Sequence, residues 1–137
     1  MSLQPSTRRL VDADLEVSLT LPAANANANS DSIDIEAVGP AALESVELEI
    51  SVPELTALVE DKTLTVTVQD SADDTTFASI AALGTLVVTG GSGDGADATS
   101  RKVRLPSTTR RYIRINAAVE ADGGDNTGSA VTYRLLN

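Results

Sequence analysis

The residues of this sequence that are best suited to chemistry are basic and lie close together. Six of the ten lysines and arginines fall within residues 101–115, RKVRLPSTTRRYIRI. Guanidinium groups form forked hydrogen bonds with carboxylates and phosphates. The stretch therefore indicates either a surface that binds a negatively charged partner or a sheet face that the acidic strands of the same chain neutralise.

The composition narrows the choice of partner. The chain carries a formal net charge of −10, so that nucleic acid and anionic membranes would repel it. Phe77, Tyr112 and Tyr133 are its only aromatic residues, and modules that bind sugars or single strands usually stack their ligands on several aromatic rings. We therefore expect neither nucleic acid nor membrane as a partner.

Catalytic side chains are scarce. The sequence contains no histidine and no cysteine, which excludes the Ser-His-Asp and Cys-His arrangements. A Ser-Lys pair around Lys62 is the one nucleophilic arrangement that stays open, although the neighbouring VEDKT is typical of a turn. We expect no enzymatic activity and no cofactor.

Two loops could hold an ion but are better explained as turns. The cluster DSADD, residues 70–74, supplies carboxylate oxygens for calcium, but its spacing does not match an EF-hand loop and aspartate favours turns. The segment GGSGDGADATS, residues 90–100, lacks the Gly-Lys-Ser/Thr ending of a phosphate loop. It is predicted to be a flexible connection, and no metal site is predicted.

The elements that must position these residues are strands. Apolar residues alternate with polar ones at a period of two, as where Leu48 and Ile50 flank Glu49. Strands are predicted over residues 14–21, 32–38, 45–52, 63–69, 74–80, 85–89, 101–105, 110–119 and 129–136. One helical turn is predicted over residues 53–61, where Pro53 would take its first position.

This pattern predicts an all-β fold, an antiparallel and jelly-roll-like β-sandwich of about eight or nine strands with little or no helix. Residues 1–12 are predicted to form an N-terminal arm, and residues 13–137 a single sandwich domain. The tract AANANANSDS, residues 23–32, is expected to be a loose, turn-prone segment.

The basic stretch is then expected to form two adjacent strands around a turn at Leu105–Pro106. Its outward side chains would face solvent or pair with Glu47 and Glu49, while Arg101, Arg110 and Arg111 would lie at strand ends. The candidate partner-contact residues, which include two arginines of the arm, are Arg8, Arg9, Arg101, Arg104, Arg110, Arg111, Tyr112 and Arg114.

Four stretches in this order resemble the Bbp16-like capsid cement (decoration) proteins of tailed bacteriophages: RLVDADLEVS, SIDIEAVG, LTVTVQDSADDTTFASIAAL and VRLPSTTRRYIRINAAV. The resemblance implies a jelly-roll-like sandwich on the outer surface of an icosahedral phage shell. It also implies contact with the major capsid protein, self-association as a dimer or trimer at symmetry axes, and no catalytic residues.

A structural virion protein is therefore the expected function: a cement that bridges neighbouring capsid subunits and stabilises the head against internal DNA pressure. The alternative is a β-sandwich module of a phage fibre or adhesin that recognises a host surface or glycan. The scarcity of aromatic residues argues against this alternative.

Overall fold

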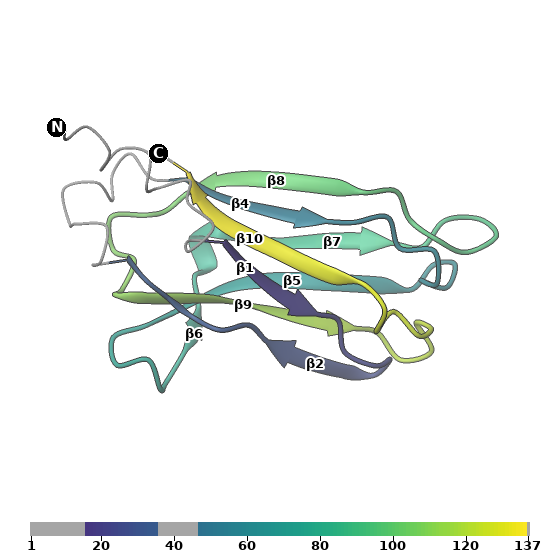
Figure 1. Ribbon diagram of the computed structural model, residues 1–137, viewed down its shortest axis with the longest axis horizontal. Coiled ribbons are helices and arrows are strands. Elements are labelled where there is room, and N and C mark those ends of the chain that lie inside the picture. Colours follow the sequence, from purple (N-terminus) through teal and green to yellow (C-terminus); the bar gives the residue numbers. More distant parts are fainter. Residues whose placement is uncertain (1–15, 36–46, 137) are drawn as a thin grey trace, which may run out of the picture.

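The computed structural model describes residues 16–35 and 47–136, which form two antiparallel β-sheets packed face to face (Figure 1). The first sheet has four strands in the order β1-β10-β4-β8. In that spatial order the strands are β1 (Glu16–Thr20), β10 (Ala130–Leu136), β4 (Glu47–Val52) and β8 (Thr99–Arg104).

The second sheet has six strands in the order β2-β9-β5-β6, with β3 also paired to β9 and β7 also paired to β5. Its strands are β2 (Ala26–Asn29), β3 (Ile33–Asp34), β5 (Thr63–Ser71), β6 (Ala78–Ser79), β7 (Thr85–Thr89) and β9 (Tyr112–Val119). A single turn of 3-10 helix, Ala81–Leu83, joins β6 to β7.

The chain changes sheet at most of its connections. It passes from β1 to β2, from β4 to β5, from β7 to β8, and then back and forth through β9 and β10. This strand order is jelly-roll-like. The predicted antiparallel β-sandwich is confirmed, with ten strands and no α-helix in the described ranges.

One hydrophobic core lies between the two sheets. Every second side chain of β5 and β9 points into it, as the alternation predicts: Leu64 and Val66 of β5 and Ile113 and Ile115 of β9 are at most 1% exposed. Burying a side chain of this size contributes about 1.5–3 kcal/mol. The periodic segments therefore supply most of the stabilising burial.

The predicted helical turn over residues 53–61 is wrong. The segment is irregular, with a bend at Thr56 and Ala57, and Leu55 forms an isolated antiparallel bridge with Ala96. Leu55 and Leu58 are 1% and 0% exposed and cover the end of the core. Their three-residue spacing imitates one helical face, but burial at the end of a sandwich accounts for it equally well.

Two further segments differ from the prediction. The loose tract contains a strand, β2, whose Asn27 and Asn29 side chains both accept hydrogen bonds from the Asn116 amide, at 3.1 and 2.8 Å. Asparagine and alanine have low strand propensity, so β2 forms because it pairs with β9.

The strand predicted over residues 74–80 is mostly turn, and only Ala78–Ser79 pairs with β5.

The two halves of the basic stretch lie in different sheets. β8 pairs with β4 in the four-stranded sheet, and β9 pairs with β2, β3 and β5 in the six-stranded sheet. The predicted adjacency of these two strands is therefore wrong, and the Leu105–Pro106 segment crosses between the sheets. The predicted arm, residues 1–12 with Arg8 and Arg9, lies outside the described residues.

Candidate partner-contact surface

The outer face of the four-stranded sheet carries a row of alternating charges. The strand register places Glu16 beside Arg134, Arg134 beside Glu49, and Glu49 beside Lys102. The Arg134 guanidinium lies 2.8 Å from the Glu49 carboxylate. The next row places Arg104 opposite Glu47. Part of the basic charge is thus balanced by acidic residues of the neighbouring strands, as one of the two interpretations predicts.

Arg101 has a structural role inside the sandwich. It lies within β8 rather than at a strand end, and its register partner is the buried Ile50, so its side chain points inward. Its guanidinium donates to the Leu83 carbonyl at 2.8 Å and to the Thr85 carbonyl at 3.0 Å. Arg101 therefore ties the edge of one sheet to the edge of the other and is poorly placed to contact a partner.

Arg110 is held by Asp70, the most buried carboxylate in the described residues. The Arg110 side chain donates to Asp70 Oδ1 from Nε at 3.0 Å and from Nη2 at 2.8 Å, and Nη2 also donates to the Asp70 carbonyl. The Arg110 backbone N–H donates to Asp70 Oδ2 at 2.9 Å. Asp70 is 8% exposed, so this pair fastens the β8–β9 crossover to the end of β5.

The two other arginines near this crossover are also held in place. Arg111 makes a forked pair with Asp34 of β3, at 3.0 and 2.9 Å, and its guanidinium lies 5.1 Å from the Tyr112 ring centroid. Arg114 donates to the Gln69 side chain at 2.8 Å and lies 3.9 Å from the centroid of the Phe77 ring. These contacts fix the positions of the cationic groups while leaving part of each exposed.

The buried tyrosine belongs to the core. Tyr133 is 1% exposed, and its hydroxyl donates to the Asp31 carbonyl at 2.6 Å. Burial in an apolar environment raises the pKa of Tyr133 to about 12, so that the phenol stays neutral. The Arg111 and Arg114 guanidiniums each lie against one face of a half-buried ring, Tyr112 and Phe77 respectively, so these rings have little free surface for stacking a sugar.

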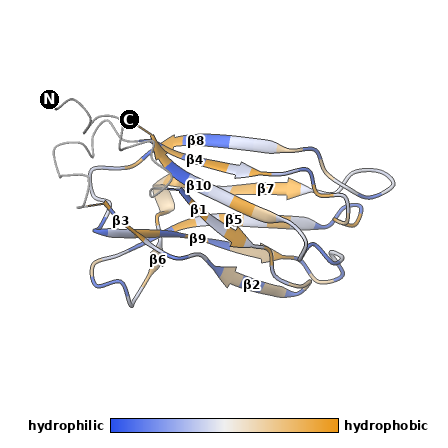
Figure 2. Cartoon of the chain, in the orientation of Figure 1, coloured by the Kyte–Doolittle hydropathy of each residue, from blue (hydrophilic) through white to orange (hydrophobic). Residues whose placement is uncertain are grey.

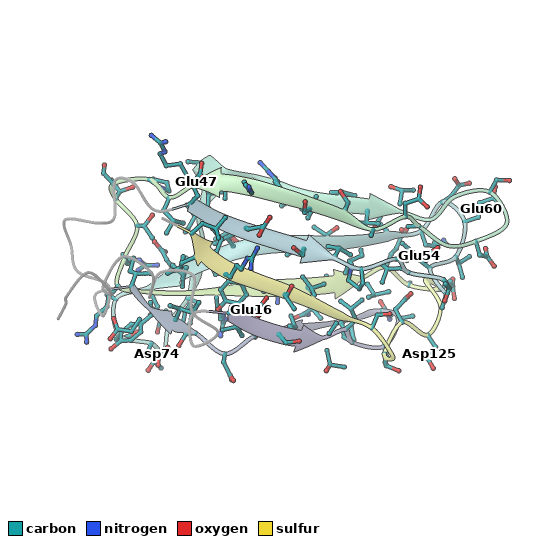
Figure 3. All side chains as sticks on the ribbon, turned by 45° about the horizontal axis from the view of Figure 1, so that its top comes forward. Glu16, Glu47, Glu54, Glu60, Asp74 and Asp125 are labelled. Atoms are coloured by element: carbon teal, nitrogen blue, oxygen red, sulfur yellow. The ribbon has the colours of Figure 1, made fainter. Side chains whose placement is uncertain are left out.

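A second charged region, which was not predicted from the sequence, lies at the opposite end of the sandwich from Arg110. We call it the acidic end: residues 21–25, 53–62, 90–98 and 120–129, the four connections at the right of Figure 1. They contain eight carboxylates and a single cationic side chain, Lys62. Figure 3 shows Glu54, Glu60 and Asp125 at this end and Glu47 and Asp74 toward the other. A charge count over the predicted turns would have revealed it.

Turn chemistry explains several of these acids. Asp61, Asp94 and Asp122 have φ values of 66°, 72° and 65°, a left-handed conformation that aspartate tolerates better than most residues. Asp125 accepts hydrogen bonds from the backbone N–H and hydroxyl of Thr127, which lower its pKa. The Asp125 carboxylate thus stabilises its own turn.

The loops of the acidic end are tied together. The backbones of Leu55 and Ala96 exchange hydrogen bonds at 2.9 and 2.8 Å, and the Gly95 N–H donates to the Leu58 carbonyl at 2.7 Å. Gly90 lies so close to the next loop that a Cβ there would come within 2.1 Å of the Val59 carbonyl oxygen. The segment predicted to be a flexible connection is therefore anchored by backbone contacts.

The cluster DSADD, residues 70–74, forms a turn. Asp73 accepts hydrogen bonds from the backbone N–H groups of Thr76 and Thr75 and from the Ser71 hydroxyl, and these bonds lower its pKa to about 2. Asp70 is bound to Arg110, and Asp74 accepts a bond from the Ser32 hydroxyl. In residues 16–35 and 47–136 no cluster of three or more potential ligands could hold a metal ion.

One solved structure supports the fold. No family model matches the chain, and no curated protein matches it. The crystal structure of the PBSX exported protein XepA is similar, with a TM-score of 0.51 and 17% identity over 89% of this chain. The similarity spans 36% of the XepA chain. A protein from Sulfurospirillum deleyianum aligns over 88% of this chain and 95% of its own, with a TM-score of 0.43 and 14% identity.

Nothing in the described part of the chain could cross a membrane as a helix.

Proposed function

We propose that this protein is a phage-associated structural protein, and more specifically a cement protein on the outer surface of an icosahedral phage shell. The observation that carries the proposal is the fold: a jelly-roll-like sandwich similar to part of XepA, an exported protein of the phage PBSX. The sequence resemblance to capsid cement proteins points in the same direction. We further propose that the protein has no catalytic role.

The proposed partners are the major capsid protein and further copies of this chain, as a dimer or trimer at symmetry axes. A cement protein acts through many identical small contacts, so that a rigid body matters more than one strong site. The tied ends of this sandwich supply such a body. The side chains of Arg101 and Arg110 are occupied within the chain, which leaves Arg104 the better candidate for a capsid contact.

The experiment compares purified shells with and without the protein. Shells that have bound it should resist heating to a higher temperature, and electron microscopy of the particles should show added density on the outer surface. Shells that neither bind the protein nor gain stability would overturn the proposal.

A matched pair of variants tests the contact. Arg104→Glu reverses one exposed charge on the four-stranded sheet, and Lys62→Glu makes the same charge change at the acidic end. We expect Arg104→Glu to lower the number of copies bound per shell and Lys62→Glu to leave it unchanged. An equal loss in both variants would point to net charge rather than to this face.

A glycan-binding module remains the alternative function. Such modules usually stack sugars on exposed rings, whereas here Tyr133 is buried and Tyr112 and Phe77 are half-buried with an arginine against one face. If the protein binds to a glycan array and does not bind to purified shells, the result would favour the alternative over the cement function.

A further inference from the structure

One edge of the six-stranded sheet is open where it borders the acidic end. β7 pairs with β5 on one side only. Beside its residues 86–89 lies an open groove of about 610 Å³, bounded on its other sides by residues 54–56 and 91–97. Thr99 of β8, the edge strand of the other sheet, also lines the groove. The groove thus lies at the seam between the two sheets.

The direction of the backbone groups of β7 follows from the Arg101 contact. Arg101 binds the Thr85 carbonyl from the side opposite β5, so Thr85 directs its polar groups away from β5. In a strand these directions alternate, so Val87 and Thr89 direct their N–H and C=O groups the same way. Within the described ranges the N–H and C=O groups of Val87 and Thr89 form no hydrogen bond. The Thr85 carbonyl, in contrast, already accepts a hydrogen bond from Arg101.

The side chains of β7 add an apolar contribution. Val87 is 52% exposed and is the only exposed large hydrophobic residue among those described, and the half-buried Leu86 packs against the core beneath the groove. Figure 2 shows hydrophobic colouring along β7 and a strongly hydrophilic stretch on β8. Exposed edge strands usually carry a charge that prevents pairing with other chains. β7, whose sequence is TLVVT, carries none.

The rim of the groove is acidic, and its charge favours a cationic binding partner. Glu54, Asp94 and Asp97 line it, and no cationic side chain does. A second copy of this chain would bring an edge with the same acidic rim, and the two rims would repel each other. An extended segment that carries lysine or arginine would gain attraction to the rim together with strand hydrogen bonds.

We propose that this groove binds an extended, cationic segment of a partner protein, which adds to the six-stranded sheet as a strand beside β7. Main-chain bonds to Val87 and Thr89 would fix the strand, and its basic side chains would lie near Asp94 and Asp97. The inference rests on the groove alone and does not depend on the proposed cement function.

The test uses a defined probe, the acetylated and amidated peptide TKVKVTK, added to the full chain in an NMR titration. We expect saturable shifts of the Val87 and Thr89 amide signals. A TKVKVTK peptide N-methylated at alternate amides, which cannot pair as a strand, and the charge-reversed peptide TEVEVTE should not produce them. Absence of saturable shifts at millimolar peptide, or equal binding of the N-methylated peptide, would overturn the proposal.

Two sets of charge-removing variants separate the groove from bulk charge. Glu54→Gln, Asp94→Asn and Asp97→Asn together remove three charges at the rim, and asparagine preserves the left-handed turn at Asp94. The matched control set removes three charges at the same end but away from the groove: Glu60→Gln, Asp61→Asn and Asp122→Asn.

We expect the rim set to weaken peptide binding about tenfold, the effect of three modest charge contacts, and the control set to change it less than about twofold. Similar losses in both sets would show that the peptide senses only the overall charge, and the proposal of a defined groove would fail.

Discussion

The two ends of the sandwich handle charge in different ways. At the end that holds the β8–β9 crossover, cationic side chains are matched to carboxylates from distant parts of the chain, such as Arg110 with Asp70 and Arg111 with Asp34. At the acidic end, eight carboxylates face a single lysine. Three of these carboxylates accept hydrogen bonds from backbone N–H groups: Asp94 from Glu60 of the neighbouring loop, Glu120 from Thr63 at the start of β5, and Asp125 from Thr127 of its own turn.

This difference shows that net charge describes the molecule poorly. Most of the net negative charge of the described residues is concentrated in the loops of the acidic end, while the rest of the described surface is close to balanced. Removing a carboxylate should therefore have opposite effects at the two ends, because one end would lose an attraction and the other a repulsion.

The largest effect is expected at Asp70. Asp70→Asn keeps the shape of the side chain but removes the charge that holds Arg110, and Asp70 is nearly buried. We expect unfolding in urea to show a loss of about 2 kcal/mol. The control Asp74→Asn, at an exposed turn, should stay within about 0.5 kcal/mol of the parent protein. Equal effects of the two changes would mean that the Arg110–Asp70 pair has no special role.

A smaller loss is expected at Arg101. Arg101→Ala removes the two hydrogen bonds that join β8 to the start of β7, leaving the Leu83 and Thr85 carbonyls to water. We expect a loss of about 1–2 kcal/mol, measured by thermal or urea unfolding. Arg104→Ala on the same strand serves as the control, because its side chain is exposed. If both variants are equally stable, the link between the sheet edges contributes nothing.

At the acidic end, removing carboxylates should raise the stability of the protein instead of lowering it. Removing three charges with Glu60→Gln, Asp61→Asn and Asp122→Asn should raise stability by a few tenths of a kcal/mol at low salt, because like charges are moved out of one region. The gain should shrink as salt screens the repulsion. Urea unfolding at low and high ionic strength checks this, and a loss of stability at both would show that these carboxylates stabilise their turns more than they repel one another.

The smallest expected effect concerns pH, and here the two ends behave alike. Hydrogen bonds lower the pKa of Asp73 to about 2 at one end and lower the pKa of Asp125 at the other. The stabilisation from Asp73 is therefore complete above its ordinary value of 3.8 and is lost as the pH falls toward about 2. Carboxyl NMR titration measures both values directly. An unshifted pKa for Asp73 would show that the turn is not formed in solution.

The alternation of apolar and polar residues predicted those strands whose core-facing side chains are apolar along the whole strand. β5, β9 and β10 alternate buried and outward residues along their length, and the predicted strands match them within a few residues. β2 was missed because asparagine and alanine reveal no core-facing pattern until Asn116 is placed beside them. The segment with Leu55 and Leu58 was predicted to be a helical turn because two leucines three residues apart fit one face of a helix. The same spacing also fits an irregular segment that covers the end of the core.

The partners of the arginines could not be read from the sequence for a different reason. Arg110 and Asp70, or Arg111 and Asp34, meet only because the chain changes sheets between them. The acidic strand β4 beside β8 was predictable, since Glu47 and Glu49 lie on the polar side of an alternating segment. Whether the remaining exposed arginine surface contacts a capsid stays a prediction.

The strand order also governs how the chain can fold. β1 pairs with β10, so the first and last described strands are neighbours, and the β7–β8, β8–β9 and β9–β10 connections all cross to the opposite sheet. Few strand pairs can form early, because most need partners far away in the chain. A growing chain cannot complete the four-stranded sheet until β10 has left the ribosome. We expect slow and cooperative folding. Deletion of β10 should therefore unfold the whole sandwich instead of removing only one strand from it.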